Sequence, residues 1–271
     1  YFLLYKNMGK QSKKVAIVVP FHKKVLSQEE KISVNHLIKF LGDFDKFLVL
    51  PESIKKVYFR IPQMKIIHFP NEYFTSVPKY CEMLNTKMFY NKFTDYEYIL
   101  IYQLDVLVFS NQLLKWCNKD YDFIGAPFFN SMIGKLSFKE QKPTTGENGG
   151  FSLRRISSFL KVIDTAEKLA TRNSINPLIR KLWFLIAVLT NQSHKIWLNA
   201  PPKDYPFNED GFWSYEAPKY YQKFKIAPFK EALRFSFERF PRKCFRLNMN
   251  QLPFGCHAWK KYDYSFWKAF L

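Results

Sequence analysis

A single carboxylate interrupts a run of apolar and aromatic residues in the middle of the chain. The run covers residues 98–109 (YILIYQLDVLVF), and its one acidic residue is Asp105. Burying an unpaired carboxylate is costly, so we expect Asp105 at the end of a buried strand, where it meets water, a metal or a partner. Ligands bind at the carboxyl ends of strands in open α/β sheets. The alternative is that Asp105 caps a turn or pairs with a nearby lysine.

Two adjacent carboxylates, Glu209 and Asp210, stand before a Gly-Phe-Trp sequence. Such a pair can supply a general base, because the scaffold can hold one carboxylate while the other faces a substrate. The alternative is a helix start with acids in its first turn, which the helix dipole favours. The two interpretations are compatible.

Three further stretches carry residues suited to ligand binding. His257 stands in a glycine-containing aromatic turn, and it matters chemically if the fold carries it to Asp105, since Asp and His are both good ligands of Mn²⁺. The paired glycines Gly149 and Gly150 allow backbone to approach a ligand closely, although their spacing matches no standard phosphate loop. His22 and Lys23 follow the first strand in a basic loop, which is either a nucleotide contact or a solvated turn.

Strands alternate with helices over the first half of the chain. Apolar patterns predict strands at 15–20, 47–50, 65–69, 98–109 and 123–126, and helices at 33–41, 76–89, 113–117 and after residue 155. This alternation favours an α/β fold with a parallel or mixed sheet. The polar residues 128–145 are predicted to form a loop. The length of 271 residues allows one large domain.

The composition narrows the classes of partner. The hydrophobic fraction of 47% supports a sizeable core, and the net charge of +19 attracts anions such as nucleic acid, anionic lipid or nucleotide diphosphates. The positive charge is spread along the chain and no nucleic-acid-binding module is visible, so we expect no nucleic-acid partner. Four scattered cysteines without a Cys-x-x-Cys pair favour free thiols in a reducing, cytoplasmic compartment.

The most apolar stretch, residues 178–189, is flanked by Arg and Lys. It is too short to span a bilayer, which needs about 20 apolar residues. It is expected either to be a core helix or to lie in a membrane interface as a peripheral contact.

Four motifs, taken in order along the chain, resemble those of glycosyltransferases of the A-type (GT-A) fold. They are Gln-Leu-Asp at 103–105, Asn-Gly-Gly-Phe-Ser-Leu-Arg at 148–154, Asn-Glu-Asp at 208–210 and Gly-Cys-His-Ala-Trp at 255–259. The chain looks closest to a bacterial family of that fold found among polysaccharide and lipopolysaccharide assembly genes and often described as a domain of unknown function. The resemblance covers residues 13–267. It implies one GT-A-like α/β domain over 1–271, with a Rossmann-like mixed sheet flanked by helices. Residues 13–127 would bind the nucleotide-sugar, and residues 128–271 would form the acceptor and catalytic half.

The resemblance also implies a metal site. Asp105 falls on the last carboxylate of the family's Asp-x-Asp motif, which would bind the Mn²⁺ or Mg²⁺ that bridges the donor diphosphate, and His257 falls on a late histidine ligand. Gln103 departs from the motif, where the family has Asp. That departure would weaken metal binding or let Gln103 contact the ribose or sugar directly.

The remaining roles follow from the same resemblance. Glu209 or Asp210 would be the base that deprotonates the acceptor, and Asp210 is favoured. The donor and acceptor sugars would be lined by Asn148, Gly149, Gly150 and Phe151. His22 and Lys23 are added to the donor site because of their place in the basic loop after the first strand, not because of the resemblance.

The resulting hypothesis is an enzyme that moves a sugar from a nucleotide-diphosphate sugar, by analogy a UDP-sugar, to a glycan or lipid-linked glycan acceptor. It would be metal-dependent and inverting, and it would work in the cytoplasm, at the inner face of the cytoplasmic membrane. A retaining or metal-independent transferase of the same fold is the alternative mechanism. A basic membrane-surface or nucleic-acid-binding protein without catalysis is the alternative from another class.

Overall fold

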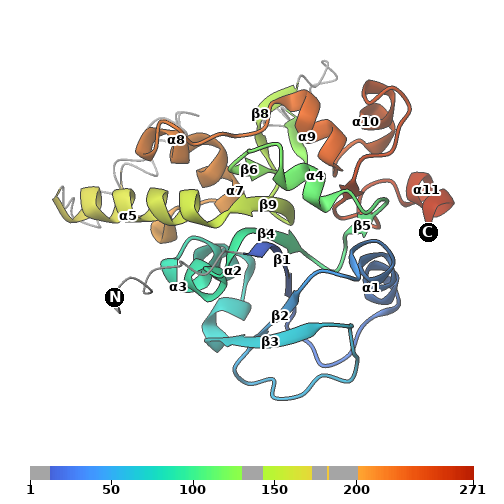
Figure 1. Cartoon of the computed structure of the whole chain (residues 1–271), viewed down its shortest axis with the longest axis horizontal. Helices are drawn as coiled ribbons and strands as arrows, with labels where there is room; N and C mark the ends of the chain where they lie inside the picture. The colour runs from blue at the N-terminus through green and yellow to red at the C-terminus, as the bar shows by residue number, and fades with distance from the viewer. Residues whose placement is uncertain (1–12, 130–142, 173–181, 183–200) are drawn as a thin grey trace, which may run out of the picture.

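A six-stranded mixed sheet lies at the centre of the molecule (Figure 1). The computed structural model describes residues 13–129, 143–172, 182 and 201–271. The strand order is β3-β2-β1-β4-β9-β6. The first four strands in this order are parallel, whereas β9 is antiparallel to both of its neighbours. The strands are β1 (Lys13–Pro20), β2 (Lys46–Pro51), β3 (Met64–Phe69), β4 (Tyr96–Tyr102), β6 (Phe123–Ile124) and β9 (Phe151–Arg155).

Helices cover both faces of this sheet. Alternate residues of β1 point to opposite faces, so Ile17 joins one core cluster and Val18 joins the other. Leu37 of α1 packs in the first cluster, and Phe159 of α5 packs in the second. This arrangement confirms the predicted α/β class with a mixed sheet flanked by helices. The covering helices are α1 (Gln28–Leu41), α2 (Val77–Leu84), α3 (Lys87–Tyr90) and α5 (Ile156–Arg172).

A smaller sheet of order β10-β11-β5 lies beside the large one, with a third apolar cluster packed on it. The strands β7 and β8 pair as a separate antiparallel ribbon. These and the remaining elements are β5 (Leu107–Val108), α4 (Leu113–Cys117), β7 (Pro127–Phe129), β8 (Pro143–Glu147), α7 (Glu209–Gly211), α8 (Ala217–Tyr220), α9 (Phe229–Phe235), β10 (Ser236–Phe237), α10 (Pro241–Leu247), β11 (Gly255–Cys256) and α11 (Tyr264–Trp267), with short turns of helix at η1 (Asn71–Phe74), η2 (Asn91–Phe93), η3 (Pro202–Asp204), η4 (Phe212–Glu216) and η5 (Lys268–Phe270).

The connections reverse direction at β1. From β1 the chain adds β2 and then β3 on one side, and it returns to the other side of β1 to form β4. The carboxyl ends of the neighbouring parallel strands β1 and β4 therefore lie side by side at this point. In open α/β sheets, the crevice at such a switch point is where ligands bind.

Three predicted elements differ from the structure. The strand predicted at 98–109 ends at Tyr102, because a turn in which the amide of Val106 donates to Gln103 O (3.0 Å) carries the chain into β5 of the smaller sheet. The helix predicted at 76–89 is two helices, separated at residues 85–86, where Thr86 caps the second one. The helix predicted at 33–41 begins earlier, at Gln28, where Ser27 and Glu30 form a capping box.

The segment from 128 to 155 also differs from its prediction. Residues 143–147 form β8, and the residues after the glycine pair form β9 before the predicted helix begins. The apolar stretch 178–189 lies outside the described residues apart from Leu182, as do residues 130–142 of the predicted loop. Each helix in the described ranges is too short or too polar to cross a lipid bilayer.

Candidate functional site

A cavity of about 740 Å³ opens at the switch point between β1 and β4. Its volume is within the range of about 300–1,000 Å³ that is typical of small-molecule sites. We call it the switch-point cavity. Its walls come from the loops after β1 and β4, the start of α1, the η1–α2 segment and residues 258–261, and they include Phe21, His22, Tyr73, Phe74, Tyr80, Gln103, Asp105, Lys260 and Lys261.

Asp105 contacts His257 beside this cavity. The distance from Asp105 Oδ1 to His257 Nε2 is 3.3 Å, and Gln103 Oε1 lies 3.1 Å from the same nitrogen. The antiparallel pairing of Leu107 with Cys256 explains the meeting, because it brings the residues before β5 beside those that follow β11. Asp105 remains half exposed, whereas His257 is mostly buried.

The charges around His257 keep it protonated. Burial lowers the pKa of His257, but the carboxylates of Asp105 and Glu238 more than offset burial and raise it to about 10. Partial burial raises the pKa of Asp105, yet His257 outweighs this effect and holds that pKa below its ordinary value. Glu238 Oε1 lies 3.5 Å from His257 Nδ1. A cation therefore faces Asp105 at neutral pH.

Asp105 and His257 place a carboxylate oxygen next to an imidazole nitrogen, and both are ligand types that Mn²⁺ accepts. Within the described residues, no group of three or more His, Cys, Asp or Glu side chains is arranged to hold a metal ion. Mg²⁺ is commonly held by one or two side chains together with phosphate oxygens and water. Loading such an ion here would release the His257 proton.

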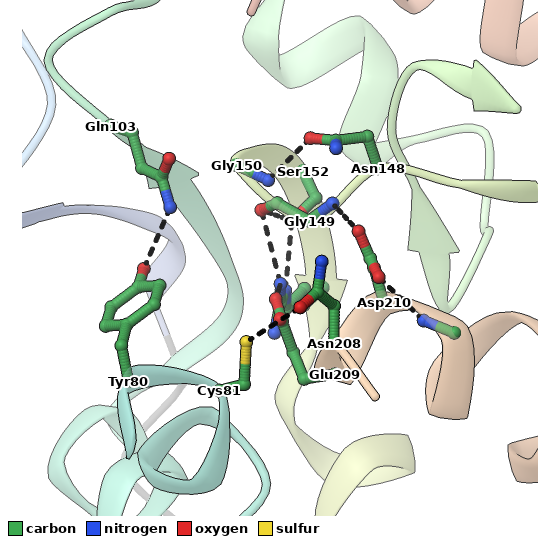
Figure 2. Close-up of polar contacts among 12 residues, drawn as sticks. Tyr80, Cys81, Gln103, Asn148, Gly149, Gly150, Ser152, Asn208, Glu209 and Asp210 are labelled. Carbon is green, nitrogen blue, oxygen red and sulfur yellow. Dashed lines mark hydrogen bonds and ion pairs between the residues drawn. The ribbon is translucent and has the colours of Figure 1, made fainter. Parts of the chain in front are cut away.

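The glycine pair lies between His257 and Glu209. Figure 2 shows Gly149 and Gly150 beside Glu209 and Asp210. A Cβ atom on Gly150 would lie 2.3 Å from His257 Nε2, and a Cβ atom on Gly149 would lie 2.2 Å from Glu209 Oε1. Asn148 Oδ1 accepts a hydrogen bond from the Gly150 amide (2.9 Å) and so fixes the turn. Only glycine permits both close approaches at once.

Glu209 is held by a buried arginine. Arg154 Nη2 lies 2.9 Å from Glu209 Oε1, and both side chains are almost fully buried. The same guanidinium donates to Gly149 O (3.2 Å), Ser152 Oγ (3.0 Å) and Tyr90 OH (3.1 Å). Glu209 is therefore committed to an internal ion pair.

Asp210 has a different environment, although it is the next residue. Its Oδ2 accepts from the Gly149 amide (3.3 Å) and its Oδ1 from the Gly211 amide (2.8 Å). Burial and the neighbouring charge of Glu209 raise the pKa of Asp210 to about 7. A carboxylate with a pKa near the working pH is well suited to general base catalysis.

Asp210 lines a second cavity of about 460 Å³, which we call the Asp210 cavity. Three aromatic side chains, Tyr205, Phe207 and Tyr215, line it together with Asn208. The first turn of α2 lies between the two cavities, since Val77 lines the switch-point cavity and Pro78 lines the Asp210 cavity.

The other predicted site residues are divided. His22 is exposed and lines the switch-point cavity. Lys23 is not among its lining residues; its Nζ lies 2.7 Å from Glu30 Oε1. Phe151 lies in the core, against the prediction that it lines the sugars, because its side chain points inward from β9 and stacks on Phe235 with ring centroids 5.1 Å apart.

Several residues at the site were not predicted from the sequence. Tyr80 accepts from Gln103 Nε2 (3.4 Å), and Glu238 approaches His257. Neither residue stands in a motif, so no local signal was available. Arg154 did carry a local sequence signal. It stands in the short segment after two glycines, and an arginine in a buried segment needs a partner.

No curated protein matches this chain. A glycosyltransferase involved in the glycosylation of the major capsid of PBCV-1 is similar in structure, with 8% identity and a TM-score of 0.43 over 90% of this chain and 92% of that one. The apo-form glycosyltransferase GlyE of Streptococcus pneumoniae TIGR4 has 12% identity and a TM-score of 0.41 over 91% of this chain and 54% of that one. Both TM-scores are too low to indicate what this chain does.

A family match covers residues 63–257, a range that contains all four motifs up to His257. The chain belongs to the family described as protein of unknown function DUF5672.

Proposed function

We propose that this chain transfers a sugar from a nucleotide-diphosphate donor to a hydroxyl group of a glycan or lipid-linked glycan. One observation carries the proposal. At the switch point of an α/β sheet, Asp105 faces a cavity of nucleotide-sugar size, and the Gly149–Gly150 turn separates it from a buried Asp210 whose pKa is about 7. Leaving-group stabilisation and base catalysis are the two functions that sugar transfer requires.

The switch-point cavity is the proposed donor site. Tyr73 and Phe74 offer aromatic surface to a nucleobase, which by analogy would be uracil. Asp105 and His257 would hold Mg²⁺ or Mn²⁺, and the ion would supply charge neutralisation at the diphosphate. Lys260 and Lys261 line the same cavity and supply positive charge there, and they support the alternative of a metal-independent transferase.

Asp210 is the proposed base in an inverting displacement. The acceptor oxygen forms a bond to the anomeric carbon of the sugar while the bond from that carbon to the diphosphate oxygen breaks. The acceptor proton passes to Asp210, and the electron pair leaves with the diphosphate. The ion pair of Glu209 with Arg154 supports this division of roles, because it occupies the other carboxylate.

The Asp210 cavity is the proposed entry for the acceptor. Its aromatic rings suit the apolar faces of sugars, and Asn208 offers an amide to hydroxyl groups. A lipid-linked acceptor at the inner face of the cytoplasmic membrane is consistent with the net charge of +19, since anionic lipid attracts such a protein.

The test is the thermal stability of the purified chain with UDP, GDP, CMP and their sugar conjugates, each with Mn²⁺, Mg²⁺ or EDTA. A ligand present at 100 times its Kd stabilises the fold by about 2.7 kcal/mol, which corresponds to a rise in Tm of roughly 5–10 °C in a chain of this size. We expect one nucleotide to give this rise and EDTA to abolish it. Transfer to an acceptor is then measured with that donor.

The variant Asp105→Asn should lose the response, and Asp43→Asn, which changes an exposed aspartate elsewhere, should retain it. A metal-independent response would keep the transferase and assign the diphosphate to the lysines. The proposal fails if no nucleotide raises the Tm, or if the rise requires metal and Asp105→Asn nevertheless responds as the wild type does.

A further inference from the structure

A third cavity, of about 420 Å³, lies between α4, α9 and the segment that follows α10. We call it the α4 cavity. It shares no lining residue with the switch-point cavity or the Asp210 cavity. The pairing of β5 with β11 lies between this cavity and the candidate active site. Asp105 and His257 flank one end of the pairing. Phe109 and Phe254 lie at the other end, where the amide of Phe109 donates to Phe254 O (2.9 Å). The proposed transfer reaction makes no use of it.

Unbalanced positive charge surrounds the α4 cavity. Lys115, Lys119 and Arg234 line it, and no Asp or Glu is among its lining residues in the described part of the chain. Lys119 and Arg234 share one carboxylate, Glu231, at 2.6 and 3.1 Å. Three cations against that one carboxylate leave two positive charges at the cavity. Such a site attracts an anion.

The other lining groups favour a ligand that also carries hydroxyl groups. The side-chain amides of Gln112 and Gln251 offer both donors and acceptors to hydroxyls. Trp116 is 4% exposed, and its indole N–H is buried without a hydrogen-bond partner among the described residues. Leu252 and Pro253 add apolar wall. A bare anion would use the cations but neither the amide acceptors nor the apolar wall.

We propose that the α4 cavity binds a sugar that carries a phosphate or carboxylate group. The charged group binds to Lys115 and Arg234, and the hydroxyls bind to the amides of Gln112 and Gln251. The ring of Trp116 forms part of the cavity wall beside this ligand. This site is separate from the proposed donor and acceptor sites, and the inference stands whether or not the chain is a transferase.

The test is calorimetric titration of the whole chain with glucose 6-phosphate and glucuronate, alongside glucose and inorganic phosphate. We expect at least one of the two charged sugars to bind more tightly than glucose and inorganic phosphate do. The double variant Lys115→Gln/Arg234→Gln should weaken that binding about tenfold or more, as the loss of hydrogen bonds to a charged group does. The matched control Lys92→Gln/Lys161→Gln removes two exposed lysines elsewhere and should leave binding unchanged.

Three further variants keep the result decisive. Gln112→Ala/Gln251→Ala should weaken sugar binding with no change of charge, which covers the case in which the cation variant does not fold. Trp116→Phe should abolish the change in tryptophan fluorescence on binding. Asp105→Asn should have no effect, which separates this site from the proposed donor site.

The proposal is overturned if neither charged sugar binds or if the control variant loses as much affinity as the cation variant. It is also overturned if inorganic phosphate binds as tightly as the sugars, since that outcome indicates an adventitious ion only.

Discussion

Replacing Arg154 with methionine should destabilise the fold strongly. Arg154 is fully buried, and its guanidinium donates four hydrogen bonds, one of them to the buried Glu209. Methionine keeps most of the apolar stem but leaves the Glu209 carboxylate buried without its cation. Removing one partner of a buried ion pair costs about 3–5 kcal/mol, and in a chain of this size that lowers the Tm by roughly 10 °C.

A double-mutant cycle separates the ion pair from the packing. Glu209→Met leaves the Arg154 guanidinium without its carboxylate partner and should cost a similar amount. Arg154→Met/Glu209→Met removes both charges, and replacing a buried pair with apolar residues is often nearly neutral. The double variant should therefore be more stable than either single variant, so the coupling between the two sites should exceed the larger single loss, that is, more than about 3 kcal/mol.

Urea denaturation followed by circular dichroism measures these differences. The control is Lys14→Met, which breaks an exposed pair with Glu97 of nearly the same length, 2.8 Å. An exposed pair contributes at most about 1 kcal/mol. The reasoning is refuted if Arg154→Met costs no more than Lys14→Met, or if the losses of the two single variants simply add in the double variant.

Four other predictions concern the acidic groups and the glycine turn. Because transfer requires ionised Asp210, kcat/KM should rise with pH through about 7 and be lost in Asp210→Asn. Because the pKa of Asp210 is raised in the folded state, its contribution to stability is fully present below about pH 4 and is lost as the pH rises through 7. Asp210→Asn does not titrate, so its Tm should exceed that of the wild type by an amount that grows from pH 4 to pH 8 and then levels off. Removal of metal with EDTA should abolish nucleotide binding in the wild type and change nothing in Asp105→Asn; an effect of EDTA on that variant would place the metal elsewhere. Gly150→Ala should displace His257 and lower the free energy of unfolding by about 1–3 kcal/mol. The control Gly211→Ala should cost less, because its new Cβ would meet its nearest neighbour at 3.3 Å. Equal melting temperatures of the two variants would contradict this prediction.

The central parallel strands could be predicted because their signal is local. The run at 15–20 is apolar throughout and β-branched, as expected of a strand covered on both faces. Residues 151–155 gave no such signal, because the buried face of β9 carries Ser152 and Arg154. The partner that makes the arginine tolerable there, Glu209, lies far along the sequence.

The candidate site was predictable in its residue types but not in its pairing. Asp105 was recognisable as a carboxylate after an apolar run, whereas its proximity to His257 could be predicted only from the order of the four motifs. The different environments of Glu209 and Asp210 depend on Arg154 and on the backbone of Gly149, and these contacts join residues that lie far apart in the sequence. The metal, the donor and the acceptor stay predictions.

The pairing of β4 with β9 has a consequence for local unfolding. Tyr102 pairs with Phe151 at the end of this ladder, and the amide of Gln103 donates to Gly150 O (3.1 Å) one step beyond it. Deeper in the ladder, around Leu100 and Leu153, both strands have a neighbour on each side, so the hydrogen bonds there cannot open unless the centre of the sheet opens. Backbone amide protons in that part should therefore exchange with solvent at a rate set by global unfolding, whereas the amide of Gln103, at the end of the ladder, should exchange faster. Movement on ligand binding then involves the end of this ladder and the helical and loop walls of the cavity, while the centre of the sheet stays fixed.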